Sequence, residues 1–125
     1  MSIAFLNGQF VPLEQASVSP LDRGFLFGDG VYEVVPAYHG HLYGLRPHVQ
    51  RLINSLASTK INNPYSAEKW EELFKAVIEH NRAQSDHFSV YCQVTRGALP
   101  KRSLSIPPDM LPTVFIMATP FSPPS

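Results

Sequence analysis

The most informative stretch of the chain runs from Asp22 to Val35 and reads DRGFLFGDGVYEVV. Glycines punctuate its first part, and glycine adopts positive backbone angles or permits close approach of another segment at little steric cost. Valine and tyrosine dominate its last part, and these residues favour a pleated, buried strand. The order predicts a tight turn that leads into a strand. Nucleotide-binding loops need a strand before their glycines and a helix after them, so this stretch fits neither the dinucleotide fingerprint nor the Walker loop.

Length and composition are those of one folded domain. The chain has 125 residues, of which 44% are hydrophobic, enough to build a core. Ten basic residues balance ten acidic ones, so the charge indicates neither nucleic-acid binding nor attraction to an anionic membrane. The N-terminus lacks the basic and long apolar regions of a signal peptide, and Cys92 is the only cysteine. We therefore expect a cytoplasmic protein without disulfides and without a membrane anchor.

Alternating residues and turn signals predict a mostly antiparallel sheet. Asn7-Gly8 separates two short apolar runs, a pattern typical of a hairpin. The predicted strands, rich in β-branched and aromatic residues, cover 3–6, 9–11, 31–38, 41–43, 88–95 and 113–119. Both faces of the 31–38 strand carry apolar residues, so we expect both to be covered.

Two amphipathic helices complete the predicted fold. The first begins near Arg46-Pro47 and continues to Leu56, with a polar stripe of His48, Arg51 and Ser55 beside its apolar one. The second follows Ser66, a suitable N-cap residue, and buries Trp70. The sum is an α+β domain, a two-layer sandwich of a mostly antiparallel five- or six-stranded sheet with two helices on one face. Residues 1–119 form this domain, and the proline- and serine-rich residues 120–125 begin a linker.

Several arginines near turns and helix edges are candidates for binding an anion, because the planar guanidinium donates two parallel hydrogen bonds to a carboxylate or phosphate. These arginines are Arg23, Arg51, Arg96 and Arg102. Glu33 lies on a covered strand face and needs a partner, for which Arg23 is the nearest candidate. Its role as a salt-bridge partner or as an acid–base group stays open. His39-Gly40-His41 has no third ligand nearby, so no metal site is predicted.

Three segments together resemble the N-terminal small domain of fold type IV pyridoxal-phosphate enzymes. They are residues 22–35, residues 48–52 (HVQRL) and residues 91–97 (YCQVTRG). The likeness extends in order over essentially the whole chain and is closest to the D-amino acid (D-alanine) aminotransferases. Branched-chain aminotransferases and aminodeoxychorismate lyases are related members. The resemblance implies pyridoxal 5'-phosphate as cofactor, amino transfer from a D-amino acid to a 2-oxo acid such as 2-oxoglutarate, and a homodimer.

The resemblance also implies roles for three residues. Arg51 would bind the cofactor phosphate. Tyr32 would hold the substrate α-carboxylate together with an arginine from the loop after residues 91–97, which we assign to Arg102. That loop departs from the family pattern of proline, arginine, one residue and histidine, because Pro100 is followed by Lys101, Arg102, Ser103 and Leu104.

The same resemblance places the Schiff-base lysine in a C-terminal domain that would follow the linker. No catalytic residue is therefore assigned within these 125 residues, and the chain alone is expected to be inactive. Two alternatives stay open: a lyase of the same family that acts on aminodeoxychorismate, and a non-catalytic domain used for assembly or anion binding.

Overall fold

A computed structural model describes residues 2–122 of the protein. Its strands are β1 (Ile3–Leu6), β2 (Gln9–Pro12), β3 (Gly30–Tyr38), β4 (His41–Leu42), β5 (Phe88–Thr95) and β6 (Thr113–Pro120). Its α-helices are α1 (Arg23–Phe27), α2 (Leu45–Thr59) and α3 (Ala67–His80), and two short 3-10 turns are η1 (Leu13–Gln15) and η2 (Arg82–Gln84). Each predicted strand and both predicted helices are present, with ends that differ by at most a few residues.

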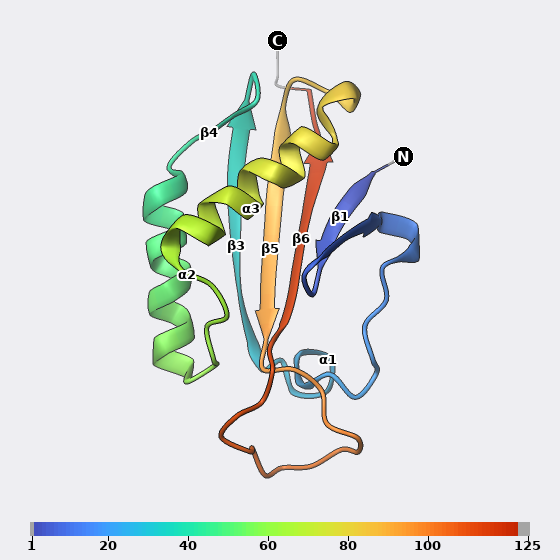
Figure 1. Cartoon of the computed structure of the whole chain (residues 1–125), viewed down its shortest axis with the longest axis vertical. Helices are drawn as coiled ribbons and strands as arrows, with labels where there is room; N and C mark the ends of the chain where they lie inside the picture. Colours follow the sequence, from blue (N-terminus) through green and yellow to red (C-terminus); the bar gives the residue numbers. More distant parts are fainter. Residues whose placement is uncertain (1, 123–125) are drawn as a thin grey trace.

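The strands described in residues 2–122 form a single six-stranded sheet in the order β2-β1-β6-β5-β3-β4 (Figure 1). Every neighbouring pair is antiparallel. The long central strands β3, β5 and β6 pair over most of their length, whereas β4 pairs with β3 only at Ala37 and Tyr38. Within residues 2–122, the outer edge of β3 is therefore unpaired along most of the strand, and residues of this strand line the site described below.

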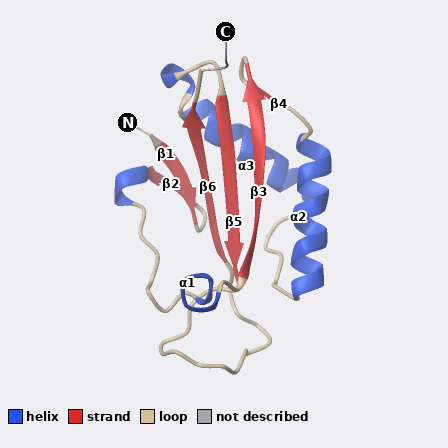
Figure 2. Ribbon diagram, turned by 180° about the vertical axis from the view of Figure 1, so that it is seen from behind, coloured by secondary structure: helices blue, strands red, loops and turns tan. Residues whose placement is uncertain are grey.

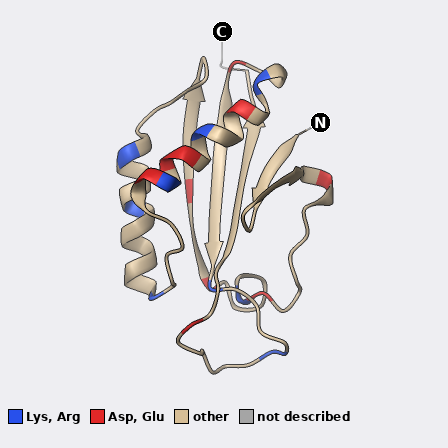
Figure 3. Cartoon of the chain, in the orientation of Figure 1, with Lys and Arg blue, Asp and Glu red and all other residues tan. Residues whose placement is uncertain are grey.

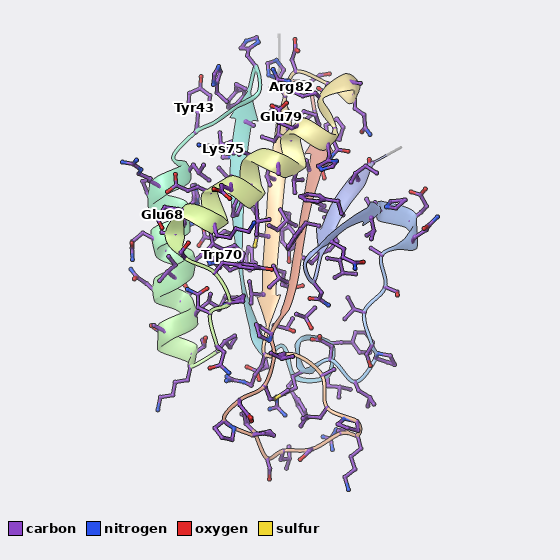
Figure 4. All side chains as sticks on the ribbon, in the orientation of Figure 1. Tyr43, Glu68, Trp70, Lys75, Glu79 and Arg82 are labelled. Carbon is purple, nitrogen blue, oxygen red and sulfur yellow. The ribbon has the colours of Figure 1, made fainter. Side chains whose placement is uncertain are left out.

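Helices α2 and α3 lie on one face of the sheet, and the opposite view shows the strands in front of α3 (Figure 2). The predicted α+β sandwich is thus confirmed. Trp70 of α3 is fully buried in the layer between helix and sheet (Figure 4), and its indole N–H donates to Asn63. Around it, the core contains Leu52, Phe74, Val90, Cys92 and Ile116 among other apolar side chains. Burial raises the pKa of the Cys92 thiol, which is consistent with the predicted core position of this residue.

The prediction that both faces of the 31–38 strand are covered is wrong for this structure. Val35 and Ala37, which point toward the helices, are buried, but Tyr32 on the other face is 64% exposed and Val34 is 41% exposed. Apolar residues on a strand indicate that a face suits packing, and they do not tell which segment packs there. Within residues 2–122, nothing covers the Tyr32 end of this face.

The predicted turn at residues 22–30 contains a short helix, α1, that the sequence did not predict. Asp22 caps its first turn, since Oδ1 accepts from the Gly24 N–H at 2.8 Å. Gly28 ends it in the left-handed conformation with φ of 64°. A Cβ at Gly30 would lie 2.9 Å from the Val94 carbonyl oxygen, so the strand pairing here needs glycine. The prediction that these glycines adopt a positive backbone angle or permit close approach of another segment is therefore confirmed at Gly28 and Gly30. The turn itself, however, is helical.

Asn81, which follows α3, joins this helix to the N-terminal strand. Its side chain accepts from the Ile3 N–H at 2.8 Å and donates to the carbonyl oxygens of Ile3 and Val77 at 2.8 and 2.7 Å. The residue is 2% exposed, so these bonds satisfy an amide that is shielded from water. Because Ile3 and Asn81 are far apart in sequence, this contact is decided by the tertiary fold.

Charged side chains gather on the helices and in the loops, while the strands are almost free of them (Figure 3). No helix within residues 2–122 is long and apolar enough to cross a bilayer. Strand β6 extends to Pro120, one residue beyond its predicted end. The predicted linker at 120–125 therefore begins inside the strand, and its residues 123–125 lie outside the described part of the chain.

Candidate functional site

Arg51 of α2 and Glu33 of β3 form a bidentate ion pair. The Arg51 Nε and Nη2 groups donate to Oε2 and Oε1 of Glu33 at 2.8 and 2.9 Å. His48, one turn earlier on α2, places Nδ1 2.8 Å from the same Oε1. The Glu33 side chain is only 4% exposed, whereas that of Arg51 is 67% exposed. A buried carboxylate thus holds an arginine whose other edge faces solvent.

The ionised form of Glu33 is favoured in spite of its burial. Burial alone would raise the pKa of this carboxyl, but the hydrogen bonds and charges of Arg51 and His48 outweigh burial and lower the pKa of Glu33. The bonds to Glu33 raise the pKa of Arg51. Both partners of the pair are therefore charged at neutral pH, and Glu33 acts as a fixed negative support rather than as a proton donor.

The predicted pairing of Glu33 with Arg23 is wrong. Along β3 the side chains alternate between faces, and Glu33 points to the side on which α2 packs. Arg23 lies at the end of the sheet and donates to Asp29 at 2.9 Å. Nearness in sequence suggested Arg23, but helix packing brought Arg51 to the carboxylate instead.

Tyr32 and Arg51 line one depression of about 370 Å³ at the unpaired edge of β3, together with Glu33, Val34 and Ser55. Two of the three predicted site residues, Tyr32 and Arg51, therefore line the same depression. Among residues 2–122, no group accepts a hydrogen bond from Arg51 Nη1. An exposed guanidinium with an unused edge, fixed by a buried carboxylate, is suited to an anionic group such as a phosphate. The donor set thus fits the phosphate of pyridoxal phosphate.

Arg102, the third predicted site residue, does not line this depression. It is exposed in the loop between β5 and β6, and its guanidinium carbon lies 5.1 Å from the centre of the Phe27 ring. Arg23 lies over the same ring at 4.7 Å. The structure of this chain therefore brings Arg102 to α1 rather than to Tyr32.

Asp29 is the centre of a second ionic cluster that the sequence did not predict. It accepts from Arg23 Nε at 2.9 Å and from Arg96 Nε at 2.6 Å. Arg96 also donates to the carbonyl oxygens of Thr59 and Lys60 at the end of α2. Burial opposes ionisation of Asp29, yet the two arginines outweigh it and lower the pKa of Asp29. Arg23 and Arg96 thus serve the structure, which leaves Arg51 and Arg102, of the four predicted anion-binding arginines, available to a ligand.

His48 is the other residue near the site to which the sequence assigned no role. Its spacing of three residues from Arg51 placed it on the same helical stripe, and that spacing was a usable signal. What the sequence lacked was the position of Glu33, which accepts contacts from both side chains.

A further hollow of about 420 Å³ is lined by Asp22, Phe25 and Gln93 among others, and by none of the predicted site residues.

Comparisons with known proteins show the family and the fold of this chain. Residues 30–125 match the model of the amino-transferase class IV family. D-alanine aminotransferase of Staphylococcus epidermidis is 35% identical over 114 residues, which are 91% of this chain and 40% of that protein.

Two solved structures are also similar. One, a branched-chain aminotransferase from Thermoproteus uzoniensis with norvaline, has a TM-score of 0.81 and 28% identity over 97% of this chain and 41% of its own. The other, a T.th. branched-chain aminotransferase with pyridoxamine 5'-phosphate, has a TM-score of 0.86 and 25% identity over 98% of this chain and 40% of its own.

The fold and the site define an α+β domain with an exposed arginine, held by a buried carboxylate, at a sheet edge. The chain belongs to the class IV aminotransferase family. It spans about 40% of the length of the relatives it matches.

Proposed function

We propose that this chain forms one wall of the active site of a pyridoxal-phosphate-dependent aminotransferase. A C-terminal domain beyond the linker would supply the opposite wall, including the lysine that binds the cofactor. The observation that carries the proposal is the shared depression of Tyr32 and Arg51, in which Glu33 holds the arginine fork. The 40% span relative to D-alanine aminotransferase of Staphylococcus epidermidis supports the presence of a further domain in the complete protein.

Arg51 would hold the cofactor phosphate through its Nη1 edge. Its Nε and Nη2 groups are occupied by Glu33, so the guanidinium cannot rotate freely and is oriented before a ligand arrives. Pyridoxal phosphate supplies an electron sink for amino-group transfer when it is bound. The similar branched-chain aminotransferase of T.th. was solved with pyridoxamine 5'-phosphate, which supports this cofactor.

Tyr32 would orient the substrate through its phenolic hydroxyl, which can donate a hydrogen bond to the α-carboxylate. Its 64% exposure beside Arg51 leaves the ring open to a ligand. Arg102 would supply the second contact to the carboxylate in the complete enzyme. We propose a D-amino acid as donor and a 2-oxo acid as acceptor, because several proteins similar to this chain are D-alanine aminotransferases. We further propose a cytoplasmic homodimer.

Amino transfer by the complete protein tests this function. The purified protein with added pyridoxal phosphate is incubated with 2-oxoglutarate and either D-alanine or L-leucine, and pyruvate, 4-methyl-2-oxopentanoate and glutamate are measured. We expect pyruvate and glutamate in equal amounts from D-alanine and much slower turnover of L-leucine. A preference for L-leucine would contradict the D-amino acid assignment. Pyruvate release from aminodeoxychorismate without amino transfer would favour the lyase alternative, and a protein that binds no cofactor would overturn the proposal.

A further inference from the structure

We infer that Phe27 and Arg23 are positioning residues for the loop that carries Arg102. This inference rests on the proposed role of Arg102 in substrate binding, and it assigns to the α1 corner, residues 22–30, the positioning of that arginine. Phe27 is half-buried at the end of α1, close in sequence to the strand that carries Tyr32. Within this chain Arg102 does not line the Tyr32 depression, so the corner fixes the loop, and Arg102 would reach the substrate carboxylate in the complete enzyme.

Two contacts join the corner to the loop at adjacent residues. The guanidinium carbon of Arg102 lies over the Phe27 ring at 5.1 Å, within the range in which an aromatic ring attracts a cation. Arg23 Nη1 donates to the carbonyl oxygen of Ser103 at 2.7 Å. The first contact holds the side chain of Arg102, and the second holds the backbone next to it. Together they restrict where the Arg102 guanidinium can lie.

The corner itself is rigid, so it can serve as a fixed support. Arg23 is 7% exposed, and its Nε is held by Asp29 at 2.9 Å. Its backbone N–H donates to the Gly97 carbonyl oxygen at 2.8 Å, where β5 leads into the loop. Asp29 in turn is held by Arg96. The loop residues Lys101, Arg102 and Leu104 are exposed, so near Arg102 the contacts with the corner hold the loop, while Asn62 holds its other end at Pro108 and Met110.

Such support matters because an unanchored arginine loses conformational freedom when it binds a carboxylate. Residues that fix the side chain beforehand reduce this entropic cost and improve substrate binding. An exposed cation–π contact corresponds to an effect of about 2- to 5-fold in an equilibrium constant. Loss of the Phe27 ring is expected to change loop order and substrate affinity by that factor, without affecting the cofactor.

The first measurement reports loop order and needs no activity. Trypsin cleavage of the complete protein after Lys101 is followed by mass spectrometry and normalised to cleavage of the same segment as a free peptide. We expect F27L to be cleaved about 2- to 5-fold faster than the wild type. Phe25, on the same helix and 77% exposed, provides the matched control F25L, which should cleave at the wild-type rate. Equal rates for F27L and F25L would overturn the anchoring of the loop.

The second measurement reports substrate binding. In steady-state amino transfer, F27L should raise the KM for the amino donor about 2- to 5-fold with little change in kcat. Its affinity for pyridoxal phosphate, measured by fluorescence, should equal that of the wild type. If cleavage accelerates in F27L but the KM does not change, whereas R102Q does raise the KM, the positioning role is wrong. If R102Q also leaves the KM unchanged, the proposed function of Arg102 is wrong instead.

R102Q tests the same contact from the exposed side and is therefore independent of the folding of F27L. It removes the Arg102 cation from the ring, while Arg23 and the rest of the α1 corner keep their sequence. Faster normalised cleavage after Lys101 is expected. In the double variant F27L/R102Q, the increase should be smaller than the product of the two single effects, because both remove one interaction. Fully multiplicative effects would show that Phe27 and Arg102 act separately.

Discussion

Arg51 on α2 and Glu33 on β3 are joined by two hydrogen bonds, so that a buried carboxylate determines which edge of an exposed guanidinium stays free. The pair links the helix layer to the sheet edge at the candidate site. It also explains why Arg51, unlike Arg23 and Arg96, is both fixed and accessible. Replacement of Arg51, Glu33 or the adjacent Tyr32 is therefore expected to affect cofactor binding, stability and substrate binding, respectively.

Replacement of Arg51 by lysine should weaken binding of pyridoxal phosphate by about tenfold or more, because the ammonium cannot hold Glu33 and a phosphate with one planar fork. The measurement is a fluorescence titration of the cofactor-free complete protein. Arg46→Lys is the matched control, since Arg46 is an exposed arginine of the same helix outside the depression. Unchanged affinity of the Arg51 variant would contradict the assignment of the phosphate site.

Replacement of Glu33 by glutamine should destabilise the protein at pH 7 by about 1–3 kcal/mol, because a charged hydrogen-bond acceptor is lost from a buried position. The folded pKa of Glu33 lies below its usual value of 4.5, so the folded state binds fewer protons than the unfolded state near that pH. The ion pair therefore contributes fully above about pH 4.5, and its contribution disappears as the pH falls through the folded pKa.

Urea unfolding of the wild type and of the Glu33→Gln variant between pH 7 and pH 3 measures this effect. The difference in unfolding free energy should be constant at neutral pH and should shrink below about pH 4.5. A difference that grows on acidification would have the wrong sign for a carboxylate with a lowered pKa, and would refute the description of the pair.

Replacement of Tyr32 by phenylalanine should raise the KM for the amino donor by up to about tenfold, because one hydrogen bond to a charged carboxylate is removed. Cofactor affinity should not change. Tyr38 lies on the same strand and face but outside the depression, so Tyr38→Phe is the control. Steady-state kinetics with D-alanine decides the matter, and equal KM values for the two variants would exclude a substrate contact by the Tyr32 hydroxyl.

Replacement of Asn81 by alanine should lower the unfolding free energy by about 2–4 kcal/mol, because it removes bonds to both backbone groups of Ile3 and to the Val77 carbonyl. Asn54→Ala, on the exposed side of α2, removes an exposed amide and should cost less than about 1 kcal/mol. Thermal and urea unfolding compare the two. Similar losses would show that the link between β1 and α3 has little energetic weight.

Local signals in the sequence were sufficient for most of the fold. Strand 88–95 was predicted with the observed bounds because its alternation is regular and turn residues flank it. Ser66 was identified as the N-cap of α3, and its hydroxyl accepts from the Lys69 N–H. Helix α1 was missed because Gly24 lowers helix propensity inside five residues, while Asp22 and Gly28 stabilise the ends.

The sequence by itself determined the α+β class, the two helices, the strands and the resemblance that singled out Tyr32 and Arg51. Periodicity and capping are local properties, so they can be read along the chain. The tertiary structure alone decided that Glu33 pairs with Arg51 rather than Arg23, and that Arg102 lies on Phe27. The partners in each pair are separated by many residues. Packing of α2 on β3 brings Arg51 within hydrogen-bonding distance of Glu33, and packing of the loop on α1 brings Arg102 within cation–π distance of Phe27.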